Sequence, residues 1–197
     1  RNLIEGGFRG PCFAVNPKGE EVAGRRSYAS LEEVDKPLDL ALIATPAESI
    51  PGILEQCGTK GVRMAVIYSA GFAEADEAGA RLQDRVVETA RRHHIRVLGP
   101  NTMGMLRPQN RLNATSGVTT KAVSGNVALV SQSGAVCSAM LDWSVPRHIG
   151  FSSMISLGAA ADVDFGDVLD FLALDAHTQC ILLYVEGIRN ARRFMSG

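Results

Sequence analysis

The chain lacks the cysteine and histidine patterns that mark disulfide-rich and metal-binding proteins. Its 197 residues contain neither a C-x-x-C pair nor a spacing of histidines typical of a metal site. We therefore expect reduced, buried thiols in a cytosolic protein, and no disulfide framework, zinc site or other metal site. The four cysteines lie far apart in the sequence, at Cys12, Cys57, Cys137 and Cys180.

Charge and hydropathy exclude two further classes of protein. The net charge is -1, without the basic surplus that nucleic-acid-binding proteins usually carry, so we expect no nucleic-acid partner. No apolar run approaches the roughly 20 residues of a membrane-spanning helix, so we expect no membrane partner. A hydrophobic share of 46% is ordinary for a globular protein, and we expect a cytoplasmic location and a small-molecule ligand.

Short apolar runs instead alternate with amphipathic stretches along most of the chain. This alternation predicts βαβ units and an α/β fold with parallel sheets. The run at 38–45 is apolar apart from Asp39 and Thr45, which predicts a strand buried on both faces. Strands are predicted within 12–19, 38–45, 62–72, 95–101, 126–131, 151–158 and 180–187. Helices are predicted within 49–61, 77–94, 134–150, 164–178 and 190–197.

The periodicity lapses between residues 103 and 124, where turn-forming residues dominate. We interpret this segment as a partly ordered connection between a first domain at 1–102 and a second at 125–197. The sequence opens on what resembles the last turn of a helix and closes on what resembles the first turn of another. We therefore expect the chain to be a fragment of a longer protein.

A strand is predicted to become a helix at the sequence SQSGA, which starts at Ser131. The unpaired N–H groups and the dipole of a helix start favour an anion, and Gly134 would let it approach the main chain. Ser131 and Ser133 could add hydroxyl donors, so the turn is a candidate cradle for phosphate or carboxylate. Simple N-capping by Ser133 explains the same residues equally well. The spacing does not fit the G-x-S-x-G nucleophile elbow.

Three other predicted strand ends carry polar residues at the edge where parallel sheets bind ligands. Asn101, after Pro100 in LGPNTMG, suits either a ligand contact or a structural turn. Lys18 in NPKG could meet a phosphate, although a solvated surface lysine is commoner. Glu186 in YVEG could orient a histidine or accept a proton at the exit of a buried strand, or cap the following helix.

GPN-x-x-G, followed by RLNAT and then by S-x-SG and YVEG, resembles the NDP-forming acyl-CoA synthetases. This family includes the succinyl-CoA synthetase alpha subunit, and the resemblance covers essentially the whole chain. It implies a Rossmann-like CoA-binding domain followed by a flavodoxin-like, parallel-sheet ligase domain. It also implies that an acyl phosphate reacts with CoA, and that a histidine carries phosphate to a nucleotide. An ATP-grasp domain or subunit would hold that nucleotide, ATP or ADP, together with Mg²⁺.

The resemblance also assigns residues to the binding of CoA or acetyl-CoA. Thr102 stands where the family often has a cysteine beside the CoA thiol, so this contact departs from the family pattern. The residues that match CoA-contacting positions are Lys18, Tyr68, Ser69, Ala70, Asn101 and Thr102.

A second group of residues matches the phosphate-handling part of the family. Ser131, Ser133 and Gly134 fall on the helix start that holds phosphate. Ser138 falls near the acyl substrate, and Glu186 falls on the carboxylate that supports the phosphorylated histidine. None of the four histidines in the sequence matches that histidine. The family would place it beyond residue 197, and a phosphate loop before residue 1. We therefore expect residues 1–197 alone to be catalytically silent, and the intact protein to be an oligomer.

Two alternatives remain open from the sequence. Within the family, the segments DVDFGDVLDFLALD and LLYVEGIRNARRFMSG look most like proteobacterial proteins fused to a GNAT acetyltransferase domain. The chain would then be an acetyl-CoA-binding regulatory region of a protein lysine acetyltransferase. A generic nucleotide-binding module is the weaker alternative, because NPK rather than an acidic residue ends the first strand.

Overall fold

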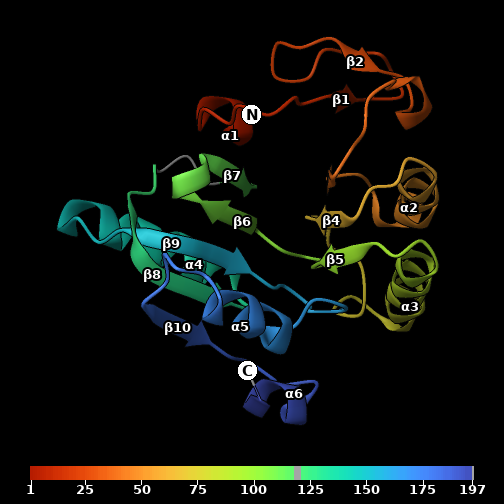
Figure 1. Cartoon of the computed structure of the whole chain (residues 1–197). Helices are drawn as coiled ribbons and strands as arrows, with labels where there is room; N and C mark the ends of the chain where they lie inside the picture. Colours follow the sequence, from red (N-terminus) through yellow and green to blue (C-terminus); the bar gives the residue numbers. More distant parts are fainter. Residues whose placement is uncertain (118–120, 197) are drawn as a thin grey trace.

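The computed structural model describes residues 1–117 and 121–196, and it has the predicted α/β architecture with parallel sheets (Figure 1). Its strands form one sheet of two strands, one of three and one of five. No helix in these ranges is long and apolar enough to cross a membrane.

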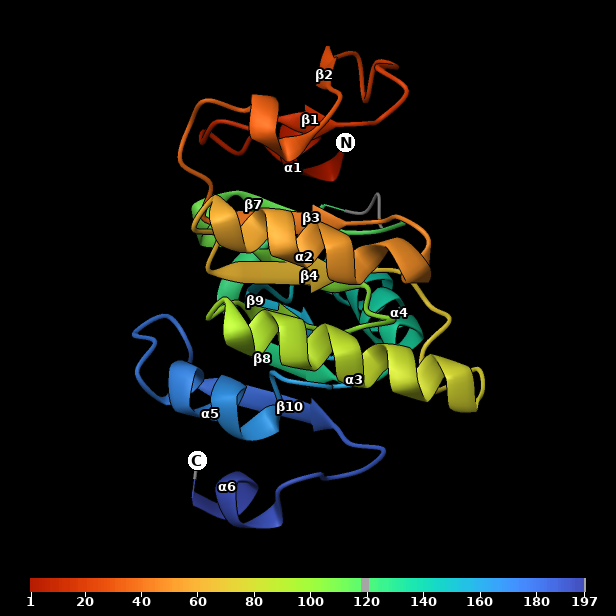
Figure 2. The same ribbon diagram turned by 90° about the vertical axis from the view of Figure 1, so that its right-hand side faces the viewer.

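The three-stranded parallel sheet organises the first half of the chain. Its order is β3 (Leu40–Ile43), β4 (Met64–Ile67) and β5 (Arg96–Leu98). The helices α2 (Ile50–Thr59) and α3 (Glu77–Arg92) lie side by side over one face of this sheet (Figure 2). The prediction that the first of these strands is buried on both faces is wrong: β3 is an edge strand, and only its last residue is fully buried.

A small N-terminal unit lies above this sheet in Figure 1. It contains α1 (Asn2–Glu5), the parallel pair β1 (Ala14–Val15) and β2 (Ser27–Tyr28), and a short 3-10 helix, η1 (Leu31–Glu33). The strand β2 was not predicted, because two residues are too short to show a periodicity.

The five-stranded sheet organises the second half, in the order β10-β8-β9-β6-β7. Its parallel strands are β8 (Ser124–Ser131), β9 (Phe151–Ser156) and β10 (Cys180–Tyr184). The associated helices are α4 (Gly134–Ser144), α5 (Phe165–Ala173) and α6 (Ala191–Ser196). Short 3-10 helices occur at η2 (Ala47–Ser49), η3 (Pro108–Asn110) and η4 (Val145–Arg147).

The segment 103–124, predicted as a partly ordered connection, contains two strands that the sequence pattern did not reveal. The strands β6 (Gly104–Arg107) and β7 (Leu112–Thr115) form an antiparallel hairpin, and β6 also pairs with β9. Four-residue strands around a turn-rich link carry too few apolar residues for a sequence pattern to reveal them. Residues 118–120 lie outside the described residues, and the division into domains at 102 and 125 stays a prediction.

The prediction of four buried thiols holds for two of them. Cys57 and Cys137 are fully buried, and burial raises the pKa of each thiol to about 11. Cys12 is only half-buried, and Cys180 is exposed because β10 is an edge strand of the five-stranded sheet.

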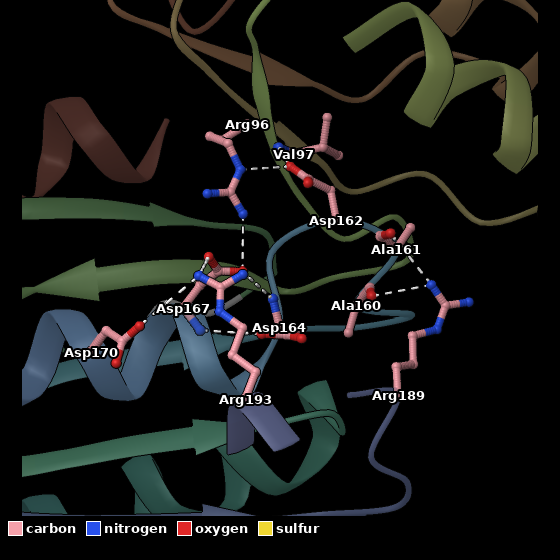
Figure 3. Close-up of polar contacts among 10 residues, drawn as sticks. All are labelled: Arg96, Val97, Ala160, Ala161, Asp162, Asp164, Asp167, Asp170, Arg189 and Arg193. Carbon is pink, nitrogen blue, oxygen red and sulfur yellow. Dashed lines mark hydrogen bonds and ion pairs between the residues drawn. The ribbon is translucent and has the colours of Figure 1, made fainter. Parts of the chain in front are cut away.

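The two halves are joined by main-chain and charged contacts at β5 (Figure 3). Val163 N–H donates to the carbonyl of Val97 at 3.1 Å, and Val97 N–H donates to Asp162 at 2.8 Å. Arg96 pairs with Asp162 at 3.0 Å and with Asp167 at 2.9 Å. Arg193 of α6 approaches the other oxygen of Asp167 at 2.5 Å, so this carboxylate ties α5 both to the first half and to α6.

Asp167 should make the stability of the fold depend on acid pH. Burial favours its neutral form, but hydrogen bonds from Arg96 and from Asp164 N–H and the charge of Arg193 hold its pKa below the ordinary value. A lowered pKa stabilises the fold above the unfolded value of about 4, and this contribution is lost as pH falls toward the folded pKa. We expect Asp167→Asn to lower the urea midpoint at pH 7 and to flatten its decline between about pH 5 and pH 3.

The control is Asp84→Asn on the exposed face of α3. It should keep the parent's urea midpoints across the same pH range. If the urea midpoint of Asp167→Asn fell with pH in parallel with that of the parent, Asp167 would not be a source of the pH dependence.

Candidate functional site

The carboxyl ends of three parallel strands meet at one edge of the five-stranded sheet. Ser131 at the end of β8 is in register with Ser156 of β9 and Tyr184 of β10. The loop that follows β5 crosses this edge. There Thr102 Oγ1 donates to the carbonyl of Ser156 at 2.5 Å, and Met103 N–H donates to Ser156 Oγ at 3.2 Å. The strand ends of the second half therefore contact a loop of the first.

The candidate CoA residues that follow β4 and β5 are brought together beside this edge. Asn101 N–H donates to the carbonyl of Ser69 at 2.9 Å, which joins the two loops. The phenol of Tyr68 donates to the carbonyl of Ala114 at 3.0 Å, and Ser69 Oγ donates to that of Thr45 at 2.5 Å. Five of the six predicted CoA-contacting residues therefore lie in one place.

These five residues differ in what they can offer a ligand. Ala70 and Asn101 are exposed, and Asn101 adopts the left-handed conformation with φ of 53°. Tyr68 is half-buried, and burial raises the pKa of its phenol, so the group stays a neutral donor. The hydroxyl of Thr102 is buried, and besides its bond to Ser156 it accepts from Gly104 N–H at 2.9 Å. The buried hydroxyl of Thr102 therefore stabilises the loop after β5 from the inside. Ala70 in the loop after β4 and Asn101 in the loop after β5 are the residues exposed to a ligand.

At SQSGA both serine hydroxyls hold the turn itself. Ser133 caps α4 by accepting from Val136 N–H at 3.4 Å, which confirms the N-capping interpretation. Ser131 is fully buried, and its hydroxyl accepts from Ser133 N–H at 3.0 Å and donates to the carbonyl of Ser133 at 2.8 Å. The O–H of Ser131 is thus already used as a donor, whereas Ser133 Oγ acts as an acceptor in the cap. The N–H groups of Gly134 and Ala135 have no acceptor among the described residues.

Gly134 has a second reason to be glycine that the sequence did not reveal. A Cβ at this position would lie 3.1 Å from Met103 Cβ and 3.8 Å from Ser156 Oγ. The start of α4 therefore packs closely against the loop after β5. Ser138, one turn further along α4, contacts Met103 Sδ and the carbonyl of Gly134, both at 3.3 Å. It faces the same loop.

Glu186 lies next to the SQSGA turn, although the strand before it is not buried as predicted. The strand β10 is at the sheet edge, and its last three residues are exposed. The N–H groups of Glu186 and Gly187 both donate to Gln132 Oε1, at 2.7 and 3.0 Å. Sequence reasoning missed Gln132 and Ser156. The sequence did carry a signal for Gln132, because a side-chain amide lies inside the predicted strand-to-helix turn. It carried no signal for Ser156.

Lys18 is the predicted residue that the structure does not bring to this edge. It lies in an exposed turn after β1, where its N–H donates to Asn16 Oδ1 at 3.0 Å. Its ammonium group makes no hydrogen bond or ion pair within the described ranges. A direct role in binding stays a prediction.

Two family models match the chain. The model of the CoA binding domain matches residues 1–108, and that of the succinyl-CoA ligase like flavodoxin domain matches residues 124–197. These matches agree with the predicted fold and order of domains.

Individual relatives are similar over nearly the whole chain. The chain is 43% identical over 199 residues to the ADP-forming acetate–CoA ligase I subunit alpha of Pyrococcus furiosus, covering 99% of this chain and 43% of that protein. It is 36% identical to the ADP-forming 4-hydroxybutyrate–CoA ligase of Nitrosopumilus maritimus, covering 98% and 28% respectively.

A solved structure is similar over the full chain. It is the dinucleotide forming acetyl-coenzyme A synthetase 1 of Ca. Korarchaeum cryptofilum, in complex with phosphate and ADP. The TM-score is 0.93 at 38% identity, covering 100% of this chain and 42% of that one.

The chain thus spans less than half of the length of each of these relatives. All three are named as ligases or synthetases, so the resemblance to GNAT-fused acetyltransferases has no support among them. The match to a CoA-binding model also disfavours a generic nucleotide module. The chain belongs to the family of CoA-binding and succinyl-CoA-ligase-like flavodoxin domains that ADP-forming acyl-CoA ligases carry.

Proposed function

We propose that this chain supplies the CoA-binding and phosphate-holding core of an ADP-forming acyl-CoA ligase. One observation carries the proposal: the loop after β5 contacts the loop after β4, the end of β9 and the start of α4. A CoA thiol held by the loops after β4 and β5 would lie beside an anion held at the start of α4. The two curated relatives described above, which are ADP-forming CoA ligases by name, support it.

Written in the ATP-forming direction, the reverse of ADP formation, the proposed chemistry exchanges a thioester for an acyl phosphate. An oxygen of inorganic phosphate attacks the acyl carbonyl of the acyl-CoA, and CoA leaves as the thiolate. The phosphoryl group then passes through a histidine to ADP, which releases the free carboxylic acid and forms ATP. That histidine would lie outside the four present in this chain, and Glu186 would support it.

The start of α4 suits the phosphoryl group in this reaction. The N–H groups of Gly134 and Ala135 point away from the helix, and the helix dipole adds roughly half a positive charge. Such preorganised dipoles stabilise charge that develops during the reaction. Ser138, on the same helix and against Met103, would lie near the acyl group.

The described residues fit CoA and phosphate better than they fit a metal ion. Ala70 and Asn101 offer an exposed surface at the strand ends, and α4 offers unpaired N–H donors. In contrast, no three His, Cys, Asp or Glu side chains in the described ranges gather in a way that could hold a metal ion. We propose that Mg²⁺ and the nucleotide bind to an ATP-grasp part of the intact protein.

Lys18 provides a test of CoA binding at the level of one residue. If its ammonium group meets a phosphate of CoA, Lys18→Ala should raise the Kd for CoA about tenfold, the scale of one charge-assisted contact. The matched control is Lys36→Ala, an exposed lysine in the loop before β3, which should leave the Kd unchanged. Calorimetry with CoA measures both. An unchanged Kd in Lys18→Ala would return Lys18 to the solvated surface, while CoA binding by the parent would still support the proposed function.

The proposed relay is tested on the full-length protein. Incubation with γ-labelled ATP and Mg²⁺ should place acid-labile, base-stable phosphate on a histidine. Glu186→Gln should reduce this labelling about 10- to 100-fold, because the ring that accepts phosphate loses the carboxylate that orients it. Binding of CoA should be unaffected. The ligase proposal would be contradicted if the parent showed no labelled histidine and instead transferred acetyl groups from acetyl-CoA to lysines of a partner protein. The acetyltransferase alternative would then hold.

A further inference from the structure

The position of Glu186 is set by its main chain and not by contacts of its own side chain. Its carboxylate is exposed and makes no hydrogen bond or ion pair with any residue in the described ranges. Any role for this carboxylate therefore depends on what fixes residues 185–190.

Regular strand pairing ends just before this segment. The last main-chain bond between β8 and β10 is the one from Gln132 N–H to the carbonyl of Tyr184, at 3.2 Å. Beyond this bond the two segments diverge, because β8 is followed by α4 whereas β10 is followed by residues 185–190 (Figure 1). The N–H groups that follow on the β10 side have no strand partner.

The side chain of Gln132 replaces the missing strand partner. A carbonyl oxygen has two lone pairs, and Gln132 Oε1 accepts from both Glu186 N–H and Gly187 N–H. Arg189 supplies the other tie of this segment, with Nη1 donating to the carbonyls of Ala160 and Ala161 at 3.3 and 3.4 Å. Of these two ties, only Gln132 belongs to the turn that opens α4.

We propose that Gln132 is a positioning residue, whose side-chain carbonyl fixes Glu186 relative to the anion site at the start of α4. The proposal rests on the proposed function, in which Glu186 supports the phosphorylated histidine next to that site. A displacement of about 1 Å in such a group can lower the rate about 100-fold. The two hydrogen bonds from the main chain of residues 186 and 187 to Gln132 can therefore affect the rate strongly.

The structural half of the proposal is tested by hydrogen exchange on the unliganded protein. Gln132→Met keeps the length of the side chain but removes the acceptor, so the amides of Glu186 and Gly187 should exchange faster. Gln132→Glu keeps an acceptor oxygen and should restore most of the protection. The matched control is Gln179→Met, which removes a side-chain hydrogen bond to Asn126 at the other end of the same strand pair. Unchanged exchange in Gln132→Met would overturn the proposal and leave the proposed function standing.

The functional half is tested by a double-mutant cycle in the full-length protein. Gln132→Met should lower kcat about 10- to 100-fold, while KM for CoA stays within about twofold, because no hydrogen bond joins Gln132 to the CoA loops among the described residues. In a Glu186→Gln background the same substitution should cost little more, since it acts through Glu186.

Additive losses would overturn the positioning role and keep Glu186 in the reaction. Full activity of Glu186→Gln alone would instead remove Glu186 from the proposed function, and the positioning role with it. These results separate the failure of one proposal from the failure of the other.

Discussion

The buried hydroxyl of Thr102 is the interaction on which the geometry of the site depends. It donates to the carbonyl of Ser156 at the end of β9 and accepts from Gly104 N–H at the start of β6. Both partners are out of reach of water, and a buried polar group left unpaired costs about 1–3 kcal/mol. Threonine therefore fixes the loop that carries Asn101 onto the end of β9.

A second set of contacts reinforces this junction. Gly158, with φ of 56°, lies so close to the loop after β5 that a Cβ there would be 2.4 Å from the carbonyl of Pro100. The next residues donate main-chain bonds to the same loop, from Ala159 to Pro100 at 2.9 Å and from Ala161 to Gly99 at 3.0 Å. Because Arg189 binds the carbonyls of 160 and 161, the loops after β5, β9 and β10 form one connected group.

The sequence predicted the place of this site more fully than its contacts. Alternating apolar and amphipathic runs identified the parallel strands of the two larger sheets and the helices between them, and the rule for parallel sheets predicts a ligand at the carboxyl ends of these strands. The short strands β6 and β7 escaped, because their pairing depends on partners distant in the sequence. The structural roles of the Ser131 and Thr102 hydroxyls were also not predicted from the sequence. A hydroxyl at a strand end looks the same in sequence whether it faces a ligand or holds a turn, and only the partner atoms separate the two cases.

The composition of the turn bears on how the proposed reaction can proceed. From Ser131 to Ala135 no side chain is charged, so an anion at this turn would be held by main-chain N–H groups and the helix dipole. Roughly half a unit charge favours a phosphoryl group without binding it as firmly as an arginine pair would. A group that must be passed on gains little from tight binding in the ground state. Glu186, fixed nearby by Gln132, would repel the same anion. A group able to carry positive charge between them, such as the histidine ring of the proposed relay, would remove this repulsion.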